Sequence, residues 1–289
     1  MSTTPTVVVK AANRLGESVL WHEASSSLMW LDLFERRLFT WRPASGTVHS
    51  VVVPLKAPLG AAIETDDPAT VLVTHPYGIA RVALDDGRVS PYADPESGRD
   101  AISYNDGKVD RFGRLWVGTS HLPEKDPRGA LWCLEPDGRA TLGDAGFVVS
   151  NGPGFSPDGS RLYFNDTFGR STLVYDIAPG DPLPRNRRVL VAYDETEGYP
   201  DGLTVDVEGC LWVAHWAGAR VTRIAPSGER VATIAFPCRN ATSVCFGGEK
   251  HDTLFVTTAR EGDEGSPAAG NVFAVKPGVC GLPEVAFRI

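Results

Sequence analysis

The sequence has few cysteines, no long hydrophobic run and no block of basic residues. Its five cysteines are widely spaced and include no CxxC pair. This argues against a disulfide framework and against a zinc–thiolate site, and it favours a reducing cytoplasm as the location. The apolar runs extend over only a few residues, so we expect no transmembrane segment and no membrane partner.

Positive charge is also scarce. Lys and Arg total 28 against 36 Asp and Glu, which gives a formal net charge of −8. A basic face for nucleic acid or for anionic lipid is therefore not expected. Apolar residues make up 42% and charged residues 22% of the 289 residues, as is usual for a globular protein. We expect one domain over residues 1–289, as a monomer or weak dimer.

Glycine and proline, in contrast, are abundant, with 30 and 22 residues. They separate short apolar stretches, and no long segment has the period of an amphipathic helix. This pattern is typical of many short strands joined by turns.

Six of these stretches share one form, a turn followed by a short apolar or aromatic strand, and they begin 43 to 49 residues apart. They are Leu28–Trp30, Val71–Val73, Leu115–Val117, Leu162–Phe164, Leu211–Val213 and Leu254–Val256. With the runs that flank each one, a repeat contains four strands. Four antiparallel strands at a period of about 45 residues indicate a propeller blade, whereas a sandwich or barrel needs no such period. The sequence therefore predicts an all-β, six-bladed β-propeller with four antiparallel strands in each blade.

The ring of a propeller has to be closed by strands from the two ends of the chain. Val7–Val9 and Val285–Phe287 are the candidates for this closure. The sequence does not decide which of them supplies the outermost strand.

Four repeats carry an oxygen-bearing side chain ten or eleven residues before the recurring strand: Glu17, Asn105, Asn151 and Asp201. Each alone is explained by the preference of such residues for turns and strand ends. Together they open the innermost strands of four blades, so we expect them to converge at one mouth of the central channel. Converging carboxylates lose hydration and repel one another, which favours a bound cation. Oxygen donors favour Ca²⁺ first, with Mg²⁺, Mn²⁺, Zn²⁺ and Fe²⁺ left open.

The ends of the recurring strands should lie at the same mouth and form its rim. The predicted rim consists of Asp32, His75, His121, Asp166, His215 and Arg260. Of these, His121, His215 and Arg260 are candidates for substrate binding, because histidine can shuttle protons or bind hydroxyl groups. A rim histidine bonded to the backbone is the plainer interpretation.

Several segments around these residues resemble the senescence marker protein (regucalcin)/gluconolactonase/luciferin-regenerating family. They are LGES at 15–18, YNDGKVDRFGRLWVGT at 104–119, SNGPGFSPDGSRLYFND at 150–166 and YPDGLTVDVEGCLWVAHW at 199–216. The resemblance implies a six-bladed propeller that holds one divalent cation in its central channel. It also implies hydrolysis of aldonolactones to aldonic acids, the activity of the family's sugar-lactone members.

The resemblance assigns roles to the four residues at matched phase. It implies that Glu17, Asn151 and Asp201 are the metal ligands and that Asp201 is also the catalytic general base. Asn105 corresponds to an asparagine that contacts substrate or metal.

Two departures from the family pattern concern substrate recognition. Gluconolactonase-like members often have an arginine where this chain has Ser103, which makes Ser103 a substrate-binding candidate. An acidic residue that holds the sugar in some members falls near Pro123, and Glu124 is the acidic residue closest to it. We therefore expect this chain to recognise its substrate differently.

The resulting hypothesis is metal-dependent hydrolysis of a sugar lactone, such as glucono-, xylono- or arabinonolactone. Two alternatives stay open at this point. One is a hydrolase of other esters or organophosphates on the same fold, and the other is a non-enzymatic calcium-binding propeller.

Overall fold

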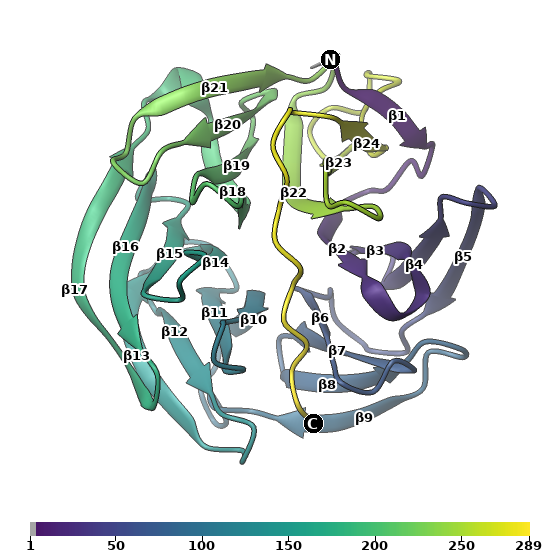
Figure 1. Ribbon diagram of the computed structural model, residues 1–289. Coiled ribbons are helices and arrows are strands. Elements are labelled where there is room, and N and C mark those ends of the chain that lie inside the picture. The colour runs from purple at the N-terminus through teal and green to yellow at the C-terminus, as the bar shows by residue number, and fades with distance from the viewer. Residues whose placement is uncertain (1–3) are drawn as a thin grey trace.

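A computed structural model of the chain describes residues 4–289, which form six four-stranded antiparallel sheets arranged in a ring (Figure 1). The prediction of a six-bladed β-propeller is thereby confirmed. In five blades the strands follow chain order from the channel outward. Within residues 4–289, the structure has no helix of the length and apolarity that a bilayer span requires.

The blades have the following strands. Blade 1 contains β2 (Gly16–His22), β3 (Ser27–Asp32), β4 (Arg37–Arg42) and β5 (Thr47–Val52). Blade 2 contains β6 (Ala62–Glu64), β7 (Thr70–His75), β8 (Gly78–Ala83) and β9 (Val89–Ala93). Blade 3 contains β10 (Ile102–Val109), β11 (Leu115–His121), β12 (Gly129–Leu134) and β13 (Ala140–Phe147).

The remaining blades follow the same plan. Blade 4 contains β14 (Ser150–Phe155), β15 (Arg161–Asp166), β16 (Ser171–Ala178) and β17 (Asp181–Ala192). Blade 5 contains β18 (Tyr199–Val205), β19 (Leu211–Trp216), β20 (Arg220–Ile224) and β21 (Arg230–Ala235). Blade 6 contains β22 (Asn240–Gly247), β23 (Thr253–Ala259), β24 (Val272–Val275) and β1 (Thr6–Val9). Two short 3₁₀ helices, η1 (Glu23–Ser25) and η2 (Glu195–Glu197), lie in connecting segments.

The recurring apolar strands of the sequence are the second strands of the blades. Each is covered by a neighbouring blade on both faces, which explains why it reads as a nearly continuous apolar run. Val71, Leu115 and Leu162 are fully buried. The apolar core therefore consists of clusters between adjacent blades.

A buried aspartate organises the turn before the second strand in two blades. In blade 3, Asp110 Oδ1 accepts the backbone N–H groups of Phe112 and Arg114, while Oδ2 accepts Trp116 Nε1 at 2.8 Å. In blade 5, Asp206 Oδ2 accepts Trp212 Nε1 at 2.9 Å. These turns also need a glycine, because Gly113 and Gly209 have φ values of 82° and 81°. Each aspartate thus ties a tight turn to a core tryptophan.

The ring is closed by the amino-terminal strand. β1 pairs antiparallel with β24 and is the outermost strand of blade 6, with Val7 opposite Phe273. The other candidate, Val285–Phe287, does not close the ring. Phe287 instead forms an isolated parallel bridge with Thr65, next to the inner strand of blade 2. Its ring is fully buried there in the core between blades 2 and 3.

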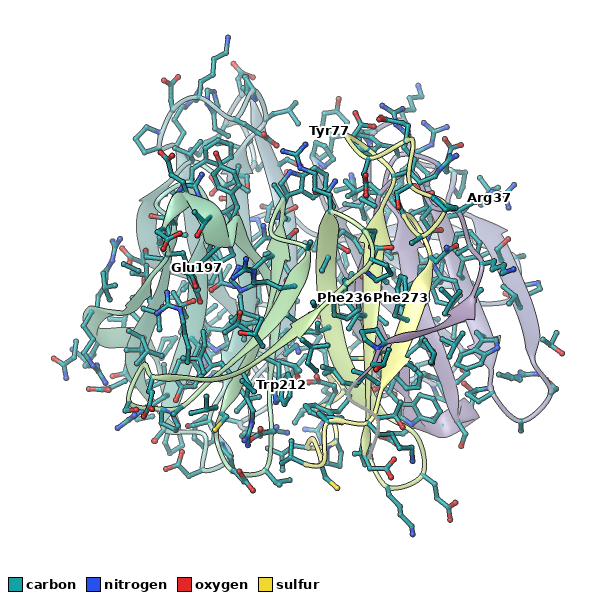
Figure 2. All side chains as sticks on the ribbon, turned by 90° about the horizontal axis from the view of Figure 1, so that it is seen from above. Arg37, Tyr77, Glu197, Trp212, Phe236 and Phe273 are labelled. Atoms are coloured by element: carbon teal, nitrogen blue, oxygen red, sulfur yellow. The ribbon has the colours of Figure 1, made fainter. Side chains whose placement is uncertain are left out.

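The carboxyl-terminal segment, residues 280–289, crosses the ring from blade 6 to blade 2 (Figure 1). It meets the ends of inner strands, since Lys108 Nζ lies 2.9 Å from Glu284 Oε1 and Phe287 N donates to Glu64 O at 2.8 Å. The opposite edge of the ring is where the second strands end. Viewed edge-on, Tyr77, just beyond β7, lies at this edge, while Trp212 lies toward the other one (Figure 2).

Candidate metal and active site

A cavity of about 400 Å³ opens at the edge of the ring where inner strands begin and second strands end. Its walls combine acidic, amide, aromatic and aliphatic side chains. It is lined by Leu15, Glu17, Leu33, Phe34, Gly60, Asn105, Asp106, Glu124, Val149, Asn151, Thr167, Phe168, Tyr199, Asp201, Trp216 and Glu261. All four residues selected by their phase in the repeat are therefore brought together here.

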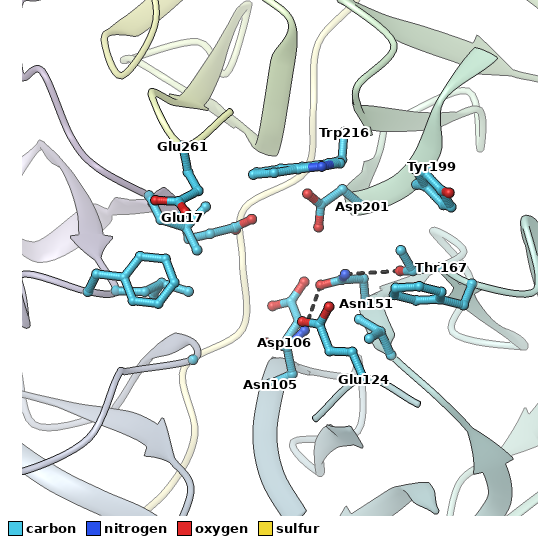
Figure 3. Close-up of a pocket in the computed structure, with 16 residues that line it drawn as sticks. Glu17, Asn105, Asp106, Glu124, Asn151, Thr167, Tyr199, Asp201, Trp216 and Glu261 are labelled. Carbon is cyan, nitrogen blue, oxygen red and sulfur yellow. Dashed lines mark hydrogen bonds between the residues drawn. The ribbon is translucent and has the colours of Figure 1, made fainter. Parts of the chain in front are cut away.

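Irregular strand pairing at Glu17, Asn105, Asn151 and Asp201 orients these four side chains toward the channel. The register between first and second strand shifts just after Glu17, Asn151 and Pro200, and between Tyr104 and Gly107 in blade 3. Such bulges bend a strand and redirect its side chains, and they are common beside active sites. Figure 3 shows the side chains from these four strands pointing into one space.

Three carboxyl groups face one another in this space, those of Glu17, Asp106 and Asp201 (Figure 3). Removal from bulk water raises the pKa of Glu17 to about 8, and the charge of Asp106 adds to the rise. Burial, followed by the charges of Glu17 and Asp106, raises the pKa of Asp201 well above its usual range. Burial also raises the pKa of Asp106. As anions these groups destabilise one another, and a divalent cation among them would remove that cost.

Asn151 is held by a hydrogen-bond network that fixes the direction of its amide. Its Nδ2 donates to Thr167 Oγ1 at 3.0 Å, and the Thr167 hydroxyl donates to Pro200 O at 2.9 Å. Its Oδ1 accepts from Asn105 Nδ2 at 2.9 Å (Figure 3). The amide oxygen of Asn151 therefore faces the carboxyl groups.

The donor set fits a hard divalent cation. Across residues 4–289, no three His, Cys, Asp or Glu side chains lie close enough to hold a metal by themselves. A cation here would therefore need an amide oxygen beside the carboxylates, and Asn151 provides one next to Glu17 and Asp201. An all-oxygen set of this kind suits Ca²⁺, Mg²⁺ or Mn²⁺.

Asp106 was not selected from the sequence, although it follows Asn105 directly. Its Oδ1 accepts from Gly107 N at 2.8 Å, and its Oδ2 accepts from Gly152 N at 2.9 Å. The second bond links blade 3 to the residue that follows Asn151. Counting back from each recurring strand selected one residue per blade and therefore missed Asp106. A search for an acidic residue next to each selected position would have found it.

Four predicted substrate-binding residues lie outside the cavity lining. Ser103 donates to the adjacent carbonyl of Tyr104 at 3.3 Å, and the backbone N–H of Arg260 donates to Arg14 O at 3.1 Å. His121 Nδ1 accepts the backbone N–H of Asp126 at 2.8 Å, which organises a loop. The role of Ser103, His121 and Arg260 toward substrate stays a prediction.

The fourth of these residues, His215, is fully buried. Its ring meets Tyr193 edge-on, with centroids 5.2 Å apart. The next residue, Trp216, lines the cavity instead. Because successive side chains of a strand point to opposite faces, the two cannot share one environment. Contact of His215 with substrate also stays a prediction.

Aromatic and acidic side chains beyond the predicted rim complete the walls. Phe34 and Phe168 each lie two residues after a predicted rim aspartate, and Glu261 directly follows Arg260. Glu261 Oε2 accepts from Arg14 Nε at 2.9 Å. At these three places the residue that lines the cavity follows the predicted rim residue by one or two positions, and inspecting the turns after these strands would have found it.

Comparison with known proteins identifies the family of this chain. A family model described as SMP-30/Gluconolactonase/LRE-like region matches residues 15–260. A pentonolactonase from Haloferax volcanii is 35% identical over 298 residues and covers 97% of each chain. A regucalcin from Xenopus laevis is 33% identical over 297 residues, again with 97% of each chain covered.

The same holds for solved structures. A calcium-binding regucalcin from Agrobacterium tumefaciens has a TM-score of 0.91 at 27% identity, covering 98% of this chain and 97% of the other. The family resemblance inferred from four segments is confirmed over nearly the whole chain, and lactone hydrolysis is an activity found among the relatives. This chain therefore belongs to the SMP-30/gluconolactonase/LRE-like family.

Proposed function

We propose that this chain hydrolyses a sugar lactone, an aldonolactone such as glucono-, xylono- or arabinonolactone, to the aldonic acid. Glu17, Asn151 and Asp201 would hold one divalent cation for this reaction. The observation that carries the proposal is the meeting of mutually repelling carboxyl groups and an oriented amide oxygen inside a cavity of about 400 Å³. A cavity of this size suits a small ligand such as one sugar ring. The names of the pentonolactonase and of the calcium-binding regucalcin support the reaction and the cation.

A bound divalent cation would polarise the lactone carbonyl and lower the pKa of the attacking water. Asp201 accepts the proton that this water loses as its oxygen bonds to the carbonyl carbon. The same carboxyl group returns the proton to the ring oxygen when the ester C–O bond breaks. Water is thus added across that bond, and the carboxyl group of Asp201 ends in its starting state.

Asn105 can orient the substrate through its carbonyl oxygen. Its amide hydrogens are already donated to Ser150 O at 2.7 Å and to Asn151 Oδ1 at 2.9 Å. The side-chain oxygen of Asn105 is therefore the group that can accept a hydrogen bond from a sugar hydroxyl.

The metal requirement is tested on chelator-treated protein in a pH-stat assay with a panel of aldonolactones. We expect hydrolysis to stop on chelation and to return with one of Ca²⁺, Mg²⁺, Mn²⁺ or Zn²⁺. Calorimetry should show one cation per chain, bound at least about 10-fold more weakly by Glu17→Gln. Full hydrolysis by verified metal-free protein would remove the cation from the proposal.

The role of Asp201 is tested by Asp201→Ala, with Asp100→Ala as a control on an exposed aspartate. A positioned acid–base group contributes at least about 10²-fold, so kcat/KM of Asp201→Ala should fall by that factor or more. The control should retain its activity. Near-normal turnover by Asp201→Ala would remove the general-base assignment.

A second candidate is hydrolysis of other esters, which the aromatic walls favour. Phe34, Phe168 and Trp216 offer an apolar surface to an aryl or alkyl group. An arylester such as phenyl acetate, run in the same assay, separates the two candidates. Faster hydrolysis of the arylester than of every aldonolactone would favour this second function.

A further inference from the structure

The charges that line the cavity have a single sign. Five of its side chains are acidic: Glu17, Asp106, Glu124, Asp201 and Glu261. Among residues 4–289, the lining contains no lysine, arginine or histidine. A divalent cation held by Glu17 and Asp201 would balance those two charges. The other three carboxylates would still face a bound substrate.

Glu124 and Glu261 stand at different sides of the mouth (Figure 3). Glu124 is exposed and lies in the loop that follows β11. That loop is anchored by His121, whose Nδ1 accepts the backbone N–H of Asp126 at 2.8 Å. Glu261 follows β23, and its side chain is 43% exposed. Both carboxylates therefore meet a substrate before it reaches the inner carboxyl groups.

The nearby guanidinium groups already have partners within the protein. Arg14 pairs with Glu261 at 2.9 Å, and its Cζ lies 4.4 Å from the centre of the Phe34 ring. Arg170 lies 3.9 Å above the ring of Tyr199 and donates to Gly198 O at 2.7 Å. Neither arginine lines the cavity. An anionic substituent on the substrate would thus find no cationic side chain in the lining, and it would meet Glu124 and the Glu261 carboxylate that is paired with Arg14, between aromatic walls that limit screening by water.

On the basis of the proposed function, we propose that Glu124 and Glu261 make this site select lactones by charge. Lactones that are neutral or carry an ammonium group are accepted. Lactones that carry a sulfate, sulfonate or carboxylate substituent are rejected. Selection arises at the mouth, before the ester reaches Asp201, and acts mainly on binding.

The test compares kcat/KM for three matched substrates: gluconolactone, its 6-amino-6-deoxy derivative and its 6-sulfate. At low salt we expect kcat/KM for the neutral substrate to be about 10-fold or more above that for the sulfate. The amino substrate should have a kcat/KM equal to or above that of the neutral one. Raising the ionic strength from about 0.01 M to about 0.15 M shortens the screening length from about 30 Å to about 8 Å and should narrow the ratio.

Glu124→Gln and Glu261→Gln identify the residues responsible. Each substitution should lower the ratio of kcat/KM for the neutral substrate to kcat/KM for the sulfated one by roughly two- to five-fold. This is the scale of a partly exposed charge interaction. Glu229→Gln makes the same change in net charge at an exposed position outside the cavity and should leave the ratio unchanged. A wild-type ratio near one, or equal ratios in the control and in both mouth variants, would overturn the inference.

Failure of the proposed function would look different. If neither these three lactones nor any other aldonolactone of the panel is hydrolysed, that function is wrong. The charge inference is then judged on the Kd values of the three matching lactams, measured by calorimetry on the same proteins. The same order of affinities and the same response to the two substitutions would support it, whereas equal affinities for all three lactams would overturn it.

Discussion

His215 is a histidine that the fold keeps neutral, and this predicts a pH-dependent contribution to stability. Burial lowers the pKa of its imidazole from 6.5 to about 4, against the opposing influence of nearby Glu197. Tyr193 covers the ring, and the charges of Arg220 and Arg230 further disfavour protonation. His215→Leu removes the titrating group from this position.

The sign follows from the two pKa values. Between pH 6.5 and about 4, His215 is protonated in the unfolded chain but neutral in the folded chain. The free energy of unfolding therefore decreases as the pH falls. Above pH 6.5 both states are neutral, and this contribution is constant. The difference between the two pKa values corresponds to about 3 kcal/mol of stability, lost progressively between pH 6.5 and pH 4.

Urea unfolding of wild type and His215→Leu at several pH values between 7.5 and 4.5 measures this contribution. Titrations of all other groups are common to both proteins and cancel in the difference. We expect the advantage of the wild type over His215→Leu to shrink by about 2 to 3 kcal/mol across this range. A difference that does not change with pH would show that His215 can take up a proton in the folded protein, and the argument would fail.

Two further predictions concern stability. Phe287→Ala should lower the free energy of unfolding by about 3 to 5 kcal/mol, because removing the fully buried ring leaves a cavity. As a control, Arg288→Ala at the exposed neighbouring position should change the free energy of unfolding by less than about 0.5 kcal/mol. Asp206→Asn should cost about 2 kcal/mol, because the fully buried carboxylate that accepts from Trp212 Nε1 and from Arg223 Nε loses its charge, while Arg223 keeps its second partner, Glu208. Urea unfolding measures both, and a cost below about 1 kcal/mol for either buried substitution would contradict the packing described.

The sequence predicts those parts of this protein that repeat. A fixed period places each second strand, and the fixed distance back to the channel places Glu17, Asn105, Asn151 and Asp201 around one cavity. Features that break the period could not be predicted in this way. Asp106 reaches the site because a bulge in β10 displaces the pairing, and no periodic count contains that displacement.

The rim shows where local sequence is insufficient. His215 and Trp216 are adjacent, yet one is buried between blades and the other lines the cavity, and the face of each depends on the register of β19. Val285–Phe287 has the composition of a strand, yet it pairs beside the inner strand of blade 2 through an isolated bridge between Phe287 and Thr65. Phe287 is buried there and Val285 is partly buried, and composition does not reveal such a contact between distant parts of the chain.

The carboxyl-terminal segment that lies across the far end of the ring has a consequence for the order of events in a catalytic cycle. Glu284 and Phe287 tie this segment to blades 3 and 2, behind the inner strands. Under the proposed function, substrate would then arrive, and product would depart, through the same opening beside Trp216. Each molecule of acid would have to leave before the next ester could occupy its place, so accumulated product should act as a competitive inhibitor.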